Sequence, residues 1–100
     1  MRKMPDLNIV EIPYLSGKLK CRYGRYLSDD GKKWIRHGLY REHHENGELA
    51  SEGTYMNGVE HGEWRDYYPN GQLAADGLYE QGIEVGRWRY WDQDGNEVIE

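Results

Sequence analysis

The sequence predicts an all-β fold, a repeat array of antiparallel β-hairpins that forms a single elongated, twisted sheet. Three observations predict it. Residues 37–60 and 61–84 are two copies of one 24-residue unit, and without any gap they are identical at 11 positions. A repeat of this length is one supersecondary unit that stacks on its neighbours. Each copy contains two turn sequences separated by segments of strand length. No segment shows helical periodicity, and frequent glycines disfavour long helices.

One domain, residues 1–100, is expected to hold four repeats. Residues 1–36 are predicted to be a degenerate N-terminal cap repeat, since terminal repeats are usually atypical. Within this cap, residues 14–19 match 68–73, and residues 24–26 match 53–55. The clearer repeats are residues 37–60, 61–84 and 85–100, the last of which is truncated.

Two turns per repeat set the expected hairpins. Asn46-Gly47, Asn70-Gly71 and Asp94-Gly95 are predicted to form type I′ turns, which need positive φ at both central residues. The second turn falls at residues 56–59 and 80–83. Strands are therefore expected between these turns, for example over residues 62–68, 72–79 and 86–91.

A glycine stands in the middle of a predicted strand in each full repeat, at Gly53 and Gly77. Mid-strand glycine weakens a strand, so a packing role is expected. We predict that an aromatic ring of the neighbouring strand lies over the bare backbone. The rings available at one repeat position are Tyr40, Trp64 and Trp88.

Composition and charge bound the class of protein. The 100 residues include nine Tyr and four Trp but no Phe, so a shallow aromatic layer is expected in place of a deep core. Residues 1–36 hold nine Lys or Arg against four Asp or Glu, whereas residues 37–100 hold four Arg against fourteen Asp or Glu. This acidic part either keeps an open sheet soluble or forms a docking face for a basic partner.

The pattern G-x-W-x-x-Y-Y-x-N-G-x-L-x-x-x-G-x-Y-x-x-G-x-x-x-G resembles the MORN repeat, in the bacterial variant of proteins of the YwqK antitoxin type. The residues that fit it best are Gly62, Trp64, Tyr67, Tyr68, Asn70, Gly71, Leu73, Gly77, Tyr79, Gly82 and Gly86. The first copy departs from it at Tyr40, His43 and His44, and the third at Trp91 and Asp92. The resemblance implies one long curved sheet and an antitoxin or immunity protein encoded beside a toxin. Classical MORN arrays are linked to membrane attachment and protein scaffolding.

Enzyme, metal and cofactor chemistry are not expected. His43 and His44 are adjacent on a predicted strand, so they point to opposite faces and should not chelate one ion. Cys21 has no feature of a nucleophile, and as the lone cysteine it fits a reducing, cytoplasmic location. No carboxylate pair stands in an apolar pocket. Nucleic acid should be repelled because the aromatic residues lie mainly in the acidic part, and no apolar run is long enough to span a membrane.

The sequence therefore predicts a non-enzymatic protein-binding module, most concretely an antitoxin that neutralises a basic toxin encoded nearby. The alternative is a MORN-like scaffold or membrane-associated adaptor, and self-association through an open sheet edge is a further possibility. The rings either pack the thin core or form a binding platform. Trp64 and Tyr67 are three apart, so either a bulge brings them together or the sheet has aromatic residues on both sides. The predicted partner-binding residues are Glu42, His44, Glu63, Asp66, Tyr67, Tyr68, Tyr90, Trp91 and Asp92.

Overall fold

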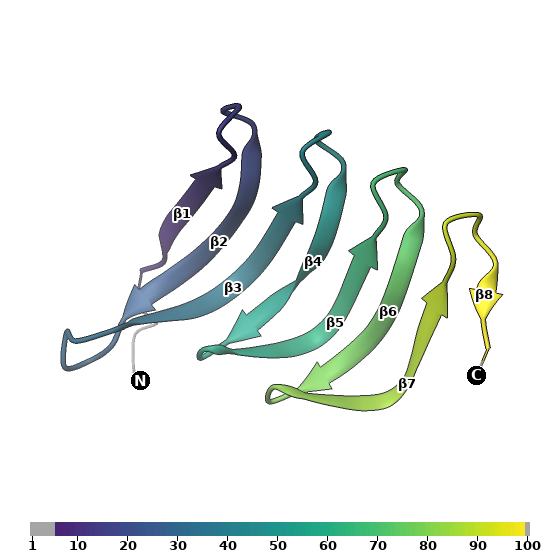
Figure 1. The fold of residues 1–100 in the computed structure, drawn as a ribbon. Coiled ribbons are helices and arrows are strands. Elements are labelled where there is room, and N and C mark those ends of the chain that lie inside the picture. The colour runs from purple at the N-terminus through teal and green to yellow at the C-terminus, as the bar shows by residue number, and fades with distance from the viewer. Residues whose placement is uncertain (1–5, 100) are drawn as a thin grey trace.

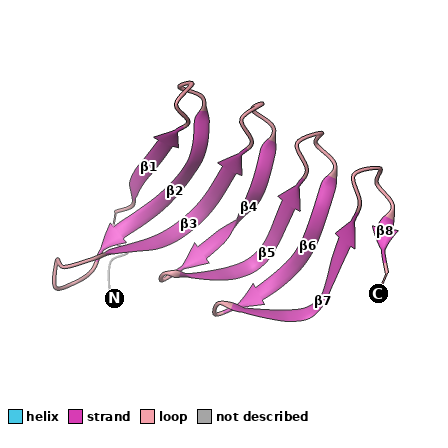
Figure 2. Cartoon of the chain, in the orientation of Figure 1, coloured by secondary structure: helices cyan, strands magenta, loops and turns pink. Residues whose placement is uncertain are grey.

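The computed structural model describes residues 6–99, which form one antiparallel sheet of eight strands in sequence order (Figure 1). These residues contain no helix (Figure 2), so the predicted all-β array of hairpins is confirmed. The strands are β1 (Asn8–Pro13), β2 (Leu19–Leu27), β3 (Trp34–His43), β4 (Leu49–Met56), β5 (Val59–Tyr67), β6 (Leu73–Glu80), β7 (Ile83–Trp91) and β8 (Glu97–Val98).

The sheet is a single layer, with each strand beside only its neighbours in sequence (Figure 1). Its dimensions are 47 × 38 × 20 Å. A single layer has no second sheet or helix to bury its side chains, so little of it is fully covered. In the described part of the chain the buried hydrophobic residues are Cys21, Ala50, Trp64 and Ala75.

Type I′ turns occur at the second turn of the two full repeats. Asn57 and Gly58 have φ of 51° and 95°, and Gln81 and Gly82 have φ of 51° and 84°. Each pair closes a two-residue loop, and in the first of them Met56 is paired directly with Val59. Positive φ at both central residues is the signature of this turn, whose twist matches that of the flanking strands.

The prediction of type I′ turns at the Asn-Gly and Asp-Gly sequences is wrong. At Asn46-Gly47 only the glycine has positive φ, 92°. The Gly47 amide donates to the His44 carbonyl, and the His44 amide donates to the Glu48 carbonyl. The Asn46 side chain explains the difference, because its Oδ1 accepts the Glu48 amide at 2.9 Å and holds the asparagine in an Asx turn.

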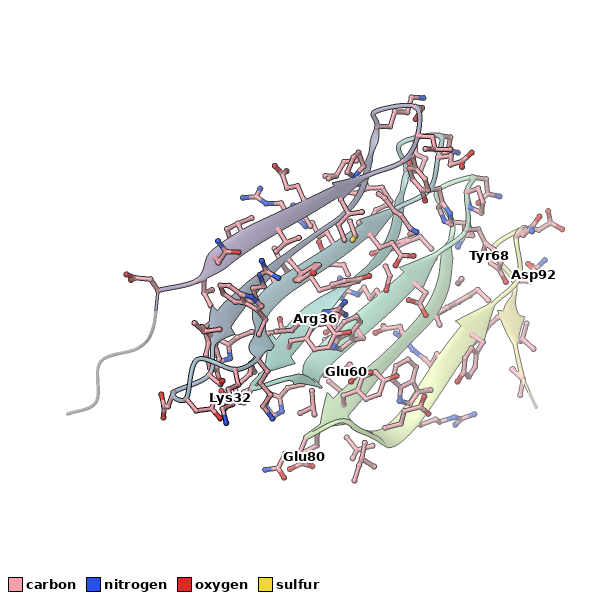
Figure 3. All side chains as sticks on the ribbon, turned by 60° about the vertical axis from the view of Figure 1, so that its left-hand side comes forward. Lys32, Arg36, Glu60, Tyr68, Glu80 and Asp92 are labelled. Atoms are coloured by element: carbon pink, nitrogen blue, oxygen red, sulfur yellow. The ribbon has the colours of Figure 1, made fainter. Side chains whose placement is uncertain are left out.

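Hydrogen bonds from turn side chains tie each hairpin to the next along one edge of the sheet. The Tyr68 hydroxyl donates to the Trp91 carbonyl at 2.7 Å, and Asn70 Nδ2 donates to the Gln93 carbonyl at 3.0 Å. Figure 3 shows Tyr68 near Asp92 at this edge. The earlier hairpins repeat the arrangement, with contacts from Tyr14 to the His43 carbonyl, from His44 Nε2 to the Tyr67 carbonyl, and from Asn46 to the Pro69 carbonyl.

Three glycines with positive φ bend the odd-numbered strands. Gly38, Gly62 and Gly86 have φ of 95°, 80° and 68°. The strand pairing shifts register opposite each of them, in the pairs β2–β3, β4–β5 and β6–β7. Such bulges bend a strand and increase its twist, and Figure 1 shows the resulting curvature of β3, β5 and β7.

Candidate protein-binding faces

One face of the sheet, here called the aromatic face, carries a continuous chain of rings from β2 to β7. Consecutive ring centroids lie 6.2 Å apart for Tyr23 and Tyr40, 5.7 Å for Tyr40 and Trp64, 6.0 Å for Trp64 and Tyr79, and 5.1 Å for Tyr79 and Trp88. Tyr55 packs edge-on against both Tyr40 and Trp64. Offset and edge-to-face pairs of this kind favour a fixed arrangement of the rings.

Two of these rings cover mid-strand glycines, as predicted. An ideal Cβ on Gly53 would lie 2.0 Å from Trp64 Cδ2, and one on Gly77 would lie 2.0 Å from Trp88 Cδ2. The prediction does not hold for Tyr40, because the residue of β2 opposite it is Tyr23, whose ring stacks beside it.

The sequence alignment pairs residues 24–26 with residues 53–55. In the structure, however, Tyr23 and not Gly24 takes the place beside Tyr40 that Gly53 has beside Trp64. Tyr40 is paired with Tyr23 on one side and with Gly53 on the other. Gly24 is buried against the opposite face, where an added Cβ would meet Leu7, Ile9 and the His37 carbonyl oxygen.

Four carboxylates flank the chain of rings. Glu42 and Asp66 lie on one side of it, while Glu60 and Glu84 lie on the other, directly opposite Tyr55 and Tyr79. Within residues 6–99 none of the four makes an ion pair. In the described part of the chain, Arg36 lines a hollow together with Glu60 on this face, but it does not come within ion-pair distance of any of the four.

Hydroxyl groups orient two of these carboxylates. Tyr40 donates to Glu42 Oε1 at 2.7 Å, and Ser51 donates to Asp66 Oδ1 at 2.7 Å. Burial, followed by the hydrogen bond to Glu42, raises the pKa of Tyr40 far above its ordinary value. Tyr40 is therefore a neutral hydrogen-bond donor at any physiological pH.

Arg36 lies over the aromatic face at its N-terminal end (Figure 3). Its guanidinium carbon is 4.6 Å from the centroid of Tyr23, 5.5 Å from that of Tyr55 and 5.8 Å from that of Tyr40. These distances are those of cation–π contacts. They show that the rings of this face accept a guanidinium group within the chain itself.

The opposite face carries a row of charges and is here called the ladder face. The row runs across β1 to β7 in direct register through Glu11, Arg22, Arg41, Glu52, Arg65, Asp76 and Arg89. Arg41 and Glu52 are 2.7 Å apart, Arg89 and Asp76 are 3.1 Å apart, and Arg65 also pairs with Glu63. The acidic groups Glu52, Glu63 and Asp76 are thus paired, unlike those of the aromatic face.

The structure divides the predicted partner-binding residues among the two faces and one edge. Glu42, Asp66 and Tyr90 lie on the aromatic face, where Asp66 and Tyr90 both pair with Ala75. Glu63 lies on the ladder face beside Arg65. Trp91 and Tyr67 are on that face too, since Trp91 stacks under Arg89 and Tyr67 interacts with Arg65. Trp64 and Tyr67 therefore point to opposite sides, and the sheet has aromatic residues on both.

The remaining three predicted residues, His44, Tyr68 and Asp92, lie at the turn edge. His44 and Tyr68 contact the carbonyls of the next hairpin. Asp92 Oδ1 accepts the backbone amides of Asp94 and Asn96 at 3.0 and 2.9 Å. These amides, with that of Asn96 first, hold the pKa of Asp92 below its ordinary value. The nine residues are thus not one continuous surface, because strand alternation and the turns separate them.

Several residues of the aromatic face lie outside the nine predicted partner-binding residues, although the predicted acidic surface of the repeats includes Glu60 and Glu84. They are Tyr23, Tyr55, Tyr79, Trp88, Arg36, Glu60 and Glu84. Glu60 and Glu84 stand at the same position of the two full repeats, next to a turn. This identity was visible in the sequence. The missing information was the register that places each of them opposite a tyrosine.

The described residues give no support for metal or thiol chemistry. No three His, Cys, Asp or Glu side chains of residues 6–99 gather as a metal site. His37 Nδ1 accepts the Asn57 amide, and His43 Nδ1 contacts the Gly47 carbonyl. Burial, and then the charge of Glu42, raises the pKa of the Cys21 thiol, so the reactive thiolate is disfavoured.

Comparison with known proteins agrees with the repeat architecture. The family described as MORN repeat variant matches residues 36–57 and 60–81, two segments that begin 24 residues apart like the repeats. These segments are similar to that family, and the single sheet of hairpins is the corresponding all-β repeat fold. Neither the search of curated proteins nor that of solved structures found a significant match. Within the described residues no helix is long and apolar enough to cross a membrane. Together these features indicate the class of repeat-based binding or scaffold modules.

Proposed function

We propose that the protein is a non-enzymatic binding module whose aromatic face docks a basic surface of a partner protein. The observation that carries this proposal is the difference between the two faces. On the ladder face Glu52, Glu63 and Asp76 are paired with arginines, whereas Glu42, Glu60, Asp66 and Glu84 surround the rings without an ion pair within residues 6–99. A basic partner would supply the missing cations.

The rings of the aromatic face suit the same partner. Arg36 already lies over three tyrosines, and a guanidinium or ammonium group of a partner could bind the remaining rings in the same way. Tyr, Trp and Arg are the residues most enriched at the energetic centre of protein interfaces. Rings would then set the lifetime of the complex, and the acidic groups its association rate.

In its most specific form, the proposal is that the partner is a basic toxin encoded beside this protein, which acts as its antitoxin or immunity protein. The sequence pattern motivates this form through its resemblance to proteins of that type, whereas the family comparison supports only the repeat itself. The experiment is co-purification with the product of the adjacent gene, together with protection of cells that express it. A wild-type protein that neither binds that product nor protects such cells would exclude the antitoxin role.

Matched variants separate the aromatic face from the rest of the sheet. Glu60→Lys with Glu84→Lys changes only the acidic side of that face, and we expect slower association with a weaker dependence on salt. Tyr90→Ala removes an exposed ring of the same face, and we expect faster dissociation. The matched control is Glu63→Lys on the ladder face, which should leave both rates unchanged if the aromatic face is the docking surface.

The alternative proposal is a MORN-like scaffold or membrane-associated adaptor. Anionic vesicles test its membrane form directly, since the uncompensated carboxylates should be repelled by anionic lipid. We expect no co-sedimentation with phosphatidylserine vesicles at physiological salt. Robust binding there would favour the adaptor over the antitoxin.

A further inference from the structure

Three shallow hollows follow one another on the ladder face. The first, of about 280 Å³, includes Leu7, Ile9, Arg22, Leu39 and Arg41 in its lining. The second, of about 150 Å³, lies between Glu52, Glu63 and Arg65. The third, of about 210 Å³, lies between Asp76, Val85 and Arg89. All three occur at corresponding places of successive repeats, so the lining of the first hollow can be compared directly with that of the other two.

The first hollow differs from the other two in charge. On the preceding strand, Arg65 and Arg89 each stand opposite an acidic residue, Glu52 and Asp76, whereas Arg41 stands opposite Arg22 there and opposite Glu52 only on the following strand. Like charges directly opposite each other on neighbouring strands are destabilising. Leu39 replaces a second acidic group, since the same repeat position is Glu63 in the next copy. The first hollow is thus lined by two arginines and no acidic residue.

Both arginines have hydrogen-bond donors left for a ligand. Arg22 is exposed and, although Glu11 stands directly opposite it on β1, it makes no ion pair within residues 6–99. Arg41 uses its Nε toward Glu52 and remains half exposed. A guanidinium group has five N–H donors, so two of them can bind one carboxylate in a bidentate or bridging manner.

Large aliphatic side chains border the two arginines. Leu7, Ile9 and Leu39 are 42%, 49% and 52% exposed. The Leu7 and Ile9 side chains lie close over the backbone at Gly24. An exposed aliphatic cluster next to two arginines with free N–H donors favours an occupant that is apolar and anionic at once.

We propose that this hollow, between β1 and β3 on the ladder face, docks an acidic segment of a partner protein in which a carboxylate stands next to a large aliphatic side chain. The aliphatic group packs on Leu7, Ile9 and Leu39, and the carboxylate accepts hydrogen bonds from Arg22 and Arg41. Residues 1–5 do not fit as the occupant, because Arg2 and Lys3 would add positive charge. The site is separate from the aromatic face, so one molecule could hold a basic partner and an acidic one on opposite faces.

The test is an NMR titration of the isotope-labelled full chain with the synthetic peptide acetyl-Gly-Glu-Leu-Leu-Glu-Gly-amide. At millimolar peptide we expect shifts of the backbone amides of Arg22, Gly24, Leu39 and Arg41. The matched peptide with Lys in place of Glu should not produce them. No shifts, shifts centred on the aromatic face, or equal shifts with the Lys peptide would each overturn the proposal.

Arg22→Glu should abolish the site, because it places an acidic residue opposite the arginine of the first hollow, as in the other two hollows. Because Glu52 and Asp76 occupy this position in the other repeats, the variant should fold. We expect affinity for the peptide to fall about tenfold or more. The control Arg87→Glu removes a cation from the third hollow and should leave affinity unchanged.

Leu39→Glu gives an independent check, since it copies Glu63 into the first hollow. This variant should lower the affinity for the acidic peptide to a similar extent. Full affinity in both Arg22→Glu and Leu39→Glu would overturn the proposal. So would concentration-dependent self-association of the wild type that these two variants abolish, because a second copy would then be the occupant.

Discussion

The indole ring of Trp88 occupies the space that a side chain at Gly77 would need. An ideal Cβ on Gly77 would lie 2.0 Å from Trp88 Cδ2 and 2.2 Å from Cε2. Gly53 and Trp64 are related in the same way one repeat earlier. The bare backbone of one strand thus serves as the packing surface for a ring of the next, which lets a single-layer sheet bury aromatic area.

Gly77→Ala should therefore destabilise the protein. In an ordinary strand position this change would be stabilising by about 0.5–1 kcal/mol, because glycine costs conformational entropy. Here the added methyl group displaces the ring, and we expect a loss of about 1–3 kcal/mol in unfolding free energy. Chemical denaturation followed by tryptophan fluorescence measures it. The control Leu78→Thr, whose side chain is half exposed, should change little; an unchanged or higher stability for Gly77→Ala would refute the packing role.

Tyr68→Phe should loosen the last hairpin. It removes the hydroxyl that donates to the Trp91 carbonyl, so we expect the free energy of unfolding to fall by about 0.5–1.5 kcal/mol. Hydrogen exchange should show the loss mainly in β7 and β8. Tyr67→Phe is the control, because the Tyr67 hydroxyl interacts with Arg65 of its own strand and, within residues 6–99, contacts no carbonyl of the next hairpin. Equal effects of the two changes would count against a specific tie at position 68.

Asp92 should contribute to stability in a pH-dependent manner. Its pKa is held below the ordinary value of 3.8 by the backbone amides of Asn96 and Asp94. A carboxyl group with a lowered folded-state pKa contributes fully above its unfolded pKa, and the contribution is lost as pH falls through the folded value. Thermal midpoints between about pH 6 and pH 2 should thus fall less steeply for Asp92→Asn than for wild type. Parallel curves would show that Asp92 does not titrate with unfolding.

Carboxylates of the two faces should differ in their effect on stability. Glu60→Gln and Glu84→Gln remove unpaired charges, so we expect changes within about 0.5 kcal/mol. Asp76→Asn removes an ion-pair partner of both Arg65 and Arg89, so we expect the free energy of unfolding to fall by up to about 1 kcal/mol. Thermal or chemical denaturation at low salt makes the comparison. A larger loss for Glu84→Gln than for Asp76→Asn would show that the aromatic-face acids are structural.

The sequence by itself determined the repeat, the all-β class, the approximate strand boundaries and the ring-over-glycine packing at Gly53 and Gly77. These features depend on local chemistry and on the fixed period of two along a strand, which a single repeat already displays. It also located Asn57-Gly58 as a turn.

Only the tertiary structure decided which residues share a surface. Bulges at Gly38, Gly62 and Gly86 shift the strand register by two residues, so the pairing beyond each bulge does not follow from the pairing before it. The register places Tyr23, and not Gly24, beside Tyr40. It also places Tyr90 opposite Ala75 on the aromatic face, and strand alternation then puts Trp91 on the ladder face. Strand register also decides which carboxylates form ion pairs. An ion pair needs an arginine directly opposite on the neighbouring strand, and the order of residues along one strand does not specify that neighbour.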